Sequence, residues 1–245
     1  MPSVYAIGDI HGEYAKLHAL LRFLPRTGDD YTVFLGDYID RGADSAKVVL
    51  RVLTEIADAP TRTVALWGNH EDMAAFNFGV PYPSAIRYDP WDWFRNGGTA
   101  TMASWRIHPP ETFNAVCPTE LAQLFPHLKR FYKGSDTGIA GMEAYLFVHA
   151  GILPGQEPET TDGETLLWVR DEFLNSYNPS GRIVVHGHTP YASVRVHPDK
   201  IGIDTAAVRG GVLTCLRLPE RVLYQADDNG LVTVSDLSEF PSGAA

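Results

Sequence analysis

The residues TVFL at 32–35 run directly into GDYIDRG at 36–42, and this junction is the most informative part of the sequence about the fold. The apolar and β-branched run predicts a buried strand, and the glycines that bound the polar loop allow tight backbone geometry. A segment with helical spacing follows, whose apolar residues are Val48, Val49, Val52, Leu53 and Ile56. A strand, a glycine-bounded loop and a helix in this order predict a βαβ unit.

The same pattern recurs along the chain. Residues 4–7 form an apolar run that precedes a similar loop and a helix, and residues 63–67 form a third run. The helix after the first run is indicated by Leu17, Leu20, Leu21 and Leu24. Further strand signals lie at 144–148, 183–185, 201–203, 212–218 and 222–225. The sequence therefore predicts an α/β protein.

Residues from about 72 to 138 break this pattern, because prolines and aromatic residues replace the regular spacing. We interpret the segment as a helical or irregular cap insertion in a single domain, 1–245. Its aromatic residues include Trp91, Trp93, Phe94 and Trp105. Aromatic side chains at such density usually pack on one another. We therefore expect them to form the core of the cap, with a substrate platform as the alternative.

Composition excludes several classes of protein. Among 245 residues, 44% are hydrophobic and 20% are charged, which argues against a fibrous or disordered chain. A formal net charge of −10 argues against nonspecific binding to nucleic acid or to an anionic membrane. Cys117 and Cys215 have no partner spacing, so neither a disulfide framework nor a cysteine metal site is expected. The start of the chain lacks a basic n-region, and we expect a cytoplasmic protein.

Polar residues gather where the predicted strands end. The strings are GDIHG at 8–12, GDYIDRG at 36–42, GNHE at 68–71, VHAG at 148–151 and VHGHT at 185–189. In open α/β sheets ligands bind outside the carboxyl ends of strands, so we expect five loops to converge at one sheet edge. Each string alone is weak evidence, but together they indicate a site. Their carboxylate, amide and imidazole groups suit Mn²⁺, Fe or Zn²⁺.

These strings resemble those of the calcineurin-like metallophosphoesterase superfamily, and more narrowly its phosphoprotein phosphatase branch and the bacterial serine/threonine protein phosphatases. The resemblance implies a four-layer αββα sandwich with two metal ions, which we expect to be Mn²⁺, with Fe or Zn as alternatives. It implies Asp9, His11 and Asp37 as ligands of the first metal. The implied ligands of the second metal are Asp37, Asn69, His149 and His188. Two such ions outweigh the charge of two aspartates, so the site would attract a phosphate dianion.

The resemblance also implies a mechanism, in which a metal-bridging water attacks phosphorus directly. His70 would protonate the leaving oxygen, and Asp40 would orient its imidazole. Arg41 and Arg170 would bind phosphate oxygens, and Asn69 would also contact the substrate.

Several positions depart from the family pattern or carry no definite assignment. His186 stands where the branch often has an apolar aromatic residue, and we interpret it as a packing residue. Pro190 stands where phosphodiesterases and nucleases usually have a second histidine, which argues against nuclease activity. The segment 96–99 either borders the site or forms a simple turn, and Arg209 either lines the site or lies on the surface.

We expect a metal-dependent phosphatase acting on phosphoserine or phosphothreonine in proteins, or on small phosphomonoesters. One alternative is a symmetrical dinucleoside tetraphosphate hydrolase, a group that typically lacks the aspartate corresponding to Asp40. Another is a non-catalytic phosphate-binding scaffold, which should have lost a ligand or the acid, whereas every position considered is present.

Overall fold

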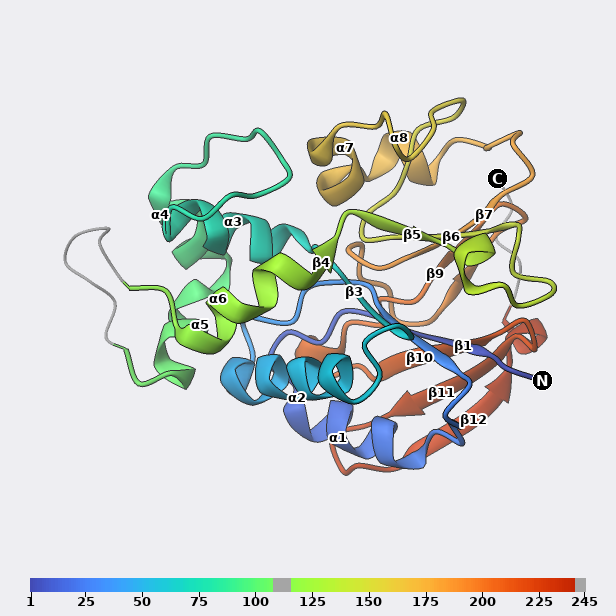
Figure 1. Cartoon of the computed structure of the whole chain (residues 1–245), viewed down its shortest axis with the longest axis horizontal. Helices are drawn as coiled ribbons and strands as arrows, with labels where there is room; N and C mark the ends of the chain where they lie inside the picture. Colours follow the sequence, from blue (N-terminus) through green and yellow to red (C-terminus); the bar gives the residue numbers. More distant parts are fainter. Residues whose placement is uncertain (108–115, 241–245) are drawn as a thin grey trace.

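The computed structural model describes residues 1–107 and 116–240 and contains two mixed β-sheets packed face to face (Figure 1). In spatial order the first sheet contains β12 (Val232–Asp236), β11 (Val222–Ala226), β10 (Leu213–Leu218), β1 (Val4–Ile7), β2 (Tyr31–Phe34), β3 (Thr63–Leu66) and β4 (Leu128–Lys129). The second contains β5 (Phe131–Lys133), β6 (Tyr145–Val148), β7 (Ile183–His186), β9 (Lys200–Gly202) and β8 (Arg195–Val196).

The alternation of side chains along the strands produces the layers. On β1, Val4 and Ala6 pack between the two sheets, whereas Tyr5 and Ile7 face the opposite side. That side is covered by α1 (Tyr14–Phe23) and α2 (Ser45–Asp58), which lie together below the first sheet in Figure 1. Both faces of β1 are therefore buried, which explains its uninterrupted apolar sequence.

The second sheet is covered in the same way on its outer face. Leu146 and Val148 of β6 pack with Leu166 of α7 (Gly163–Trp168) and Phe173 of α8 (Asp171–Leu174). Both helices lie above this sheet in Figure 1. The order of layers is thus helix, sheet, sheet, helix, and the predicted four-layer α/β sandwich is confirmed.

The strands that carry the polar strings run parallel within each sheet. Strands β1, β2 and β3 are adjacent and parallel, and β6, β7 and β9 are adjacent and parallel in the other sheet. Their carboxyl ends therefore lie together. The sequence missed β4, β5 and β8, which are two or three residues long, and also the half-exposed edge strand β12.

The predicted cap range contains helices and also short strands. Its helical elements are α3 (Asn69–Asn77), α4 (Pro90–Trp93), η1 (Phe94–Gly98), α5 (Thr99–Ser104), α6 (Thr119–Leu124), η2 (Phe125–His127) and η3 (Gly134–Thr137). Helices α3 to α6 lie at one end of the molecule in Figure 1, and β4 and β5 belong to the sheets. Residues 108–115 of the range lie outside the described part, and the cap boundaries stay a prediction.

Within the cap, Trp93 is 1% exposed and packs against Phe78 and Phe94, whereas Trp91 is half exposed. The remaining short helical turns are η4 (Ala207–Arg209) and η5 (Leu237–Glu239). In the described part of the chain, every helix is too short or too polar to span a bilayer.

Lys16 on α1 is a buried cation that the sequence did not single out. Its Nζ donates to the carbonyl oxygens of Ala207, at 2.6 Å, and Gly211, at 2.8 Å. An ion pair with the exposed Asp228 at 2.8 Å balances its charge. One side chain thus fixes the loop between β9 and β10 onto the helix layer.

We expect Lys16→Met to lower the free energy of unfolding by about 1–3 kcal/mol, because two carbonyl groups lose their donor. Urea denaturation measures this. Lys47→Met, which removes an exposed lysine paired with Asp44, is the control and should change stability by no more than about 0.5 kcal/mol. Equal effects of the two substitutions would contradict the role assigned to Lys16.

Candidate metal centre

The five polar loops meet at the adjoining carboxyl ends of the two sheets. The first three strings follow β1, β2 and β3, whereas His149 and His188 follow β6 and β7 of the second sheet. The expectation of one sheet edge was therefore wrong in detail, because the parallel strands of two sheets end side by side. The cluster lies between the sheets, and its histidines are at most 4% exposed.

One group of donors combines a carboxylate, an amide and two imidazoles. The Asn69 Oδ1 atom lies 3.0 Å from His149 Nε2 and 2.9 Å from His188 Nδ1. The Asp37 Oδ1 atom lies 3.5 Å from the same His149 nitrogen. The structure thus brings together all four residues that the resemblance implies for the second metal.

A second group uses the other oxygen of the same aspartate. Asp37 Oδ2 lies 3.3 Å from His11 Nε2 and 4.0 Å from His70 Nε2. Within each group of His11, Asp37 and His70, and of Asp37, His149 and His188, the ligand atoms lie within 4.8 Å of one another. Asp37 is therefore the shared member, as the resemblance implies.

Asp9 belongs to neither of these tight groups. Its carboxylate oxygens accept the backbone N–H of His188 at 3.0 and 3.2 Å. Burial raises the pKa of Asp9, and the nearby charges of Asp204 and Asp37 add to this effect. Asp9 thus lies beside the cluster, and its role as a ligand stays a prediction.

The hydrogen bonds of the imidazoles suit metal ligands. His11 Nδ1 and His149 Nδ1 each lie 2.8 Å from a backbone carbonyl oxygen, so each donates its proton there and leaves a lone pair on Nε2. Burial lowers the pKa of His149 and of His188, which keeps both rings neutral. Burial alone would raise the pKa of Asp37, but the neighbouring histidines hold it well below its usual value.

The Nε2 lone pair of His149 faces two oxygen atoms, Oδ1 of Asn69 and Oδ1 of Asp37, which are acceptors and not hydrogen-bond donors. The Nε2 atom of His188 is buried and has no hydrogen-bond partner among the described residues. An ionised carboxylate, an amide oxygen and neutral imidazoles are the protonation states in which side chains bind divalent cations. The residues present therefore fit a pair of metal ions bridged by Asp37.

The predicted acid–base pair is formed at the edge of this cluster. His70 Nδ1 donates to Asp40 Oδ2 at 2.6 Å, so Nε2 is directed toward the cluster. Arg41 contacts His11 Nε2 at 2.6 Å and His70 Nε2 at 2.8 Å, which places its guanidinium over the site. Arg170 is exposed and donates to Thr189 Oγ1 at 3.4 Å. Both arginines are exposed.

Five site residues other than glycine adopt a left-handed backbone conformation. They are His11, Asp37, Asp40, Arg41 and His188, with φ values of 46°, 53°, 75°, 69° and 64°. Such conformations are unfavourable for residues with a Cβ, and they cluster at functional sites where surrounding structure enforces them.

Glu71 supplies part of this support and was missed as a functional residue. Its carboxylate accepts the backbone N–H groups of Asp37, Tyr38 and Ile39 at 2.8, 2.9 and 3.2 Å. It also accepts that of Gly68 at 3.1 Å. A buried carboxylate thus fixes the loop that carries Asp37. The sequence offered one indication of a role for Glu71, namely its position as the last residue of the GNHE string.

The remaining sequence candidates lie in different surroundings. His186 is 1% exposed, donates Nδ1–H to the Gly187 carbonyl and packs its ring edge against Phe173. Arg209 lies on the surface and lines a cavity of about 470 Å³ with Tyr191. The segment 96–99 does border the site, because the carbonyl of Gly97 accepts the N–H of Arg41 at 3.3 Å.

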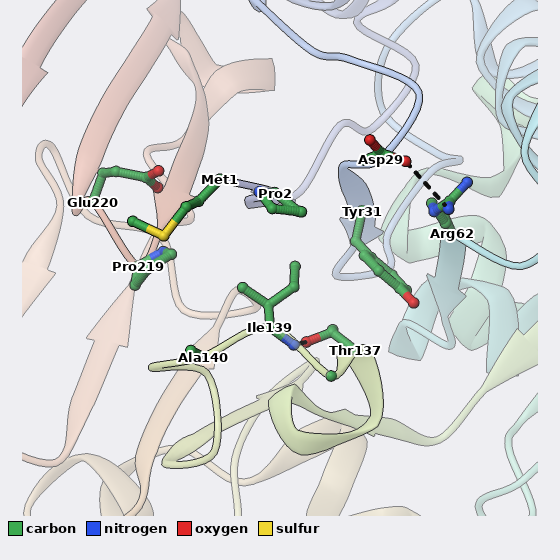
Figure 2. A pocket seen from close by; sticks show the side chains of 11 residues that line it. Met1, Pro2, Asp29, Tyr31, Arg62, Thr137, Ile139, Ala140, Pro219 and Glu220 are labelled. Carbon is green, nitrogen blue, oxygen red and sulfur yellow. Dashed lines mark hydrogen bonds and ion pairs between the residues drawn. The ribbon is translucent and has the colours of Figure 1, made fainter.

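A larger cavity of about 530 Å³ lies away from this chemistry (Figure 2). It is lined by Met1, Ile139 and Pro219 among others, and an ion pair of Asp29 with Arg62 at 3.5 Å lies at one side. None of the residues assigned to the metal centre lines it. Cavity size therefore does not identify the site, whereas donor chemistry does.

The fold and this centre together define a metal-dependent phosphoesterase. A family model described as calcineurin-like phosphoesterase matches residues 2–217, and the chain belongs to this family.

Two curated relatives differ in the activity that their names state. Serine/threonine-protein phosphatase 2 of Escherichia coli (strain K12) is 29% identical over 228 residues, which cover 88% of this chain and 92% of that protein. The asymmetrical bis(5'-nucleosyl)-tetraphosphatase PrpE of Anoxybacillus flavithermus (strain DSM 21510 / WK1) is 25% identical over 237 residues, covering 87% of this chain and 89% of that protein.

A solved structure supports the fold alone. The cold-active protein-tyrosine phosphatase of a psychrophilic Shewanella species aligns with a TM-score of 0.61 at 17% identity. The alignment covers 96% of this chain and 80% of that chain.

We expect Glu71→Gln to lower the free energy of unfolding by about 2–3 kcal/mol, because an amide NH₂ would face backbone N–H donors in place of a charged acceptor. The affinity for Mn²⁺ should also fall, since the loop carrying Asp37 loses its support. Urea denaturation and calorimetric titration with Mn²⁺ measure the two effects. Glu172→Gln on the exposed face of α8 is the control. Unchanged Mn²⁺ affinity in Glu71→Gln would refute the role of Glu71.

Proposed function

We propose that this protein is a phosphomonoesterase that acts on phosphoserine or phosphothreonine in proteins, or on small phosphomonoesters. The observation that carries the proposal is the His70–Asp40 pair, with its Nδ1 to Oδ2 distance of 2.6 Å, beside two donor groups that share Asp37. The group that contains His11 and Asp37 would hold one ion, with Asp9 as a further ligand. The group that contains Asp37, His149 and His188 would hold another, with Asn69 as a further ligand. In this arrangement His70 would act as an acid beside a centre that attracts phosphate.

Two bound cations would supply positive charge and a nucleophilic water at neutral pH, so no side-chain nucleophile is needed. Arg41 is placed to bind phosphate oxygens, because its guanidinium already lies against the ring nitrogens that face the centre. Arg170, which donates to Thr189, would bind phosphate oxygens as well. Bidentate hydrogen bonds from a guanidinium fit the geometry of a phosphoryl group.

His70 is the group that delivers a proton to the leaving oxygen. Burial lowers its pKa, whereas the charge of Asp37 opposes that effect. A bound phosphoryl group adds negative charge beside Nε2 and therefore favours the protonated ring. Asp40 holds the proton of Nδ1 and keeps Nε2 directed toward the substrate.

A second candidate is hydrolysis of a dinucleoside tetraphosphate. It is favoured by the similarity to PrpE, whose name specifies asymmetrical cleavage, so the symmetrical reaction first considered has less support. The first candidate ranks higher because the Asp40–His70 pair suits protonation of an alkoxide, which is a poor leaving group. A non-catalytic scaffold ranks last, since the acid and the donor groups are all present.

The proposal is tested by comparing turnover of a phosphothreonine peptide with turnover of diadenosine tetraphosphate by the Mn²⁺-loaded protein. We expect the higher kcat/KM for the peptide. Chelator-treated protein should be inactive on both and recover when Mn²⁺ is added. A large preference for the dinucleotide would reverse the ranking, and full activity of metal-free protein would refute the proposed mechanism.

We expect His70→Asn to reduce kcat for the peptide by about 10²–10⁴-fold, the usual contribution of a general acid. Because His70 also lies within the donor group of His11 and Asp37, calorimetric titration with Mn²⁺ must accompany the kinetics. Retention of both metal ions with loss of turnover supports the acid. Loss of one ion would assign His70 as a ligand instead, and unchanged turnover would exclude both roles.

A further inference from the structure

The carboxylate of Asp40 is held by two side chains from the cap. The indole Nε1–H of Trp93 donates to both oxygens, at 3.0 Å from Oδ1 and 2.9 Å from Oδ2. The hydroxyl of Thr101 donates to Oδ1 at 2.5 Å and accepts the backbone N–H of Asp40 at 2.8 Å. The three side chains are each at most 1% exposed.

We propose that Trp93 and Thr101 are positioning residues for the general acid, because they fix the carboxylate of Asp40 in the orientation that holds His70. This inference rests on the proposed role of His70 in protonating the leaving group. The cap would then contribute to turnover through Asp40, without touching the substrate.

The hydrogen bonds of Asp40 support this assignment. Oδ1 accepts from Thr101 and Trp93, and Oδ2 accepts from His70 and Trp93. Burial raises the pKa of Asp40 to about 7, and the bonds from Thr101 and Trp93 lower it. Removing either donor leaves a buried carboxylate oxygen with fewer partners, so the group can rotate away from Nδ1.

The backbone conformation of the cap brings Trp93 and Thr101 to the same carboxylate, that of Asp40. Asp89 accepts the N–H of Trp91 and so caps the short helix α4 that carries Trp93. Gly97 has a φ of 113°, which a residue with a Cβ rarely adopts, and turns the chain between Trp93 and Thr101. A Cβ on Gly98 would collide with the Trp93 ring. The two glycines therefore have a structural purpose at this site.

A third tryptophan provides a matched comparison within the cap. Trp105 is partly buried, and its Nε1–H donates to Glu120 at 3.0 Å, away from Asp40. Replacement of Trp105 by phenylalanine removes the same kind of hydrogen bond and a similar volume. It therefore reports the general effect of disturbing the cap.

The kinetic test compares phenyl phosphate with p-nitrophenyl phosphate, because p-nitrophenolate leaves with little need for a proton. We expect Thr101→Val to lower kcat for phenyl phosphate by about 10–100-fold, the usual cost of losing a partner of a catalytic or ligand side chain. The loss for p-nitrophenyl phosphate should be several-fold smaller. Thr101→Ser, which keeps the hydroxyl, should restore the ratio. Trp93→Phe should repeat the effect, and Trp105→Phe should leave the ratio unchanged.

A second readout does not depend on turnover. The Nδ1 proton of His70 should give a downfield ¹H NMR signal in the Zn²⁺-loaded protein, assigned by its loss in His70→Asn. We expect this signal to shift or disappear in Thr101→Val and in Trp93→Phe, and to persist in Trp105→Phe.

The outcomes separate the inference from the proposed function. If the wild-type protein hydrolyses neither ester, the phosphomonoesterase proposal fails, and the NMR signal alone decides whether the cap holds the Asp40–His70 pair. If the wild-type protein is active, equal losses on both esters, or an unchanged His70 signal in both variants, would overturn the positioning role.

Discussion

The acceptance of four backbone N–H groups by Glu71 is the interaction on which the site depends. Asp37, whose two oxygens face different donor groups, adopts a left-handed backbone conformation, and such a conformation costs about 1–3 kcal/mol. The carboxylate of Glu71 offsets this cost by accepting the N–H groups of residues 37–39 and by tying that loop to Gly68 in the loop after β3. Without this support the shared ligand would have no fixed direction.

The charge of the site differs from that of the whole chain. The protein carries a formal net charge of −10, yet buried carboxylates serve separate purposes at the centre. Asp37 is common to the two donor groups that could hold metal ions, whereas Asp40 and Glu71 bind hydrogen-bond donors of the protein. Acidity on this scale is therefore compatible with a pocket that attracts phosphate, because bound metal ions determine its local charge.

The cap has a closer relation to the centre than its composition suggested. Its aromatic side chains do pack on one another, as expected, but Trp93 also uses its N–H group to bind Asp40. The interpretation of the tryptophans as either core or substrate platform omitted this third use. A buried indole needs a hydrogen-bond partner, and here that partner is a carboxylate of the predicted acid–base pair.

Local sequence pattern predicted the α/β class and the donor types, whereas the four-layer arrangement was implied by the family resemblance. The strand at residues 4–7 was predicted residue for residue, since a run buried on both faces is recognisable alone. Short strands such as β8 contain too few residues for an alternation of apolar and polar side chains to be recognised. Two facts follow from the tertiary structure alone: both sheets supply donors, and the indole of Trp93 contacts Asp40, 53 residues away in the sequence. Such contacts follow from packing between distant segments, which local periodicity does not encode.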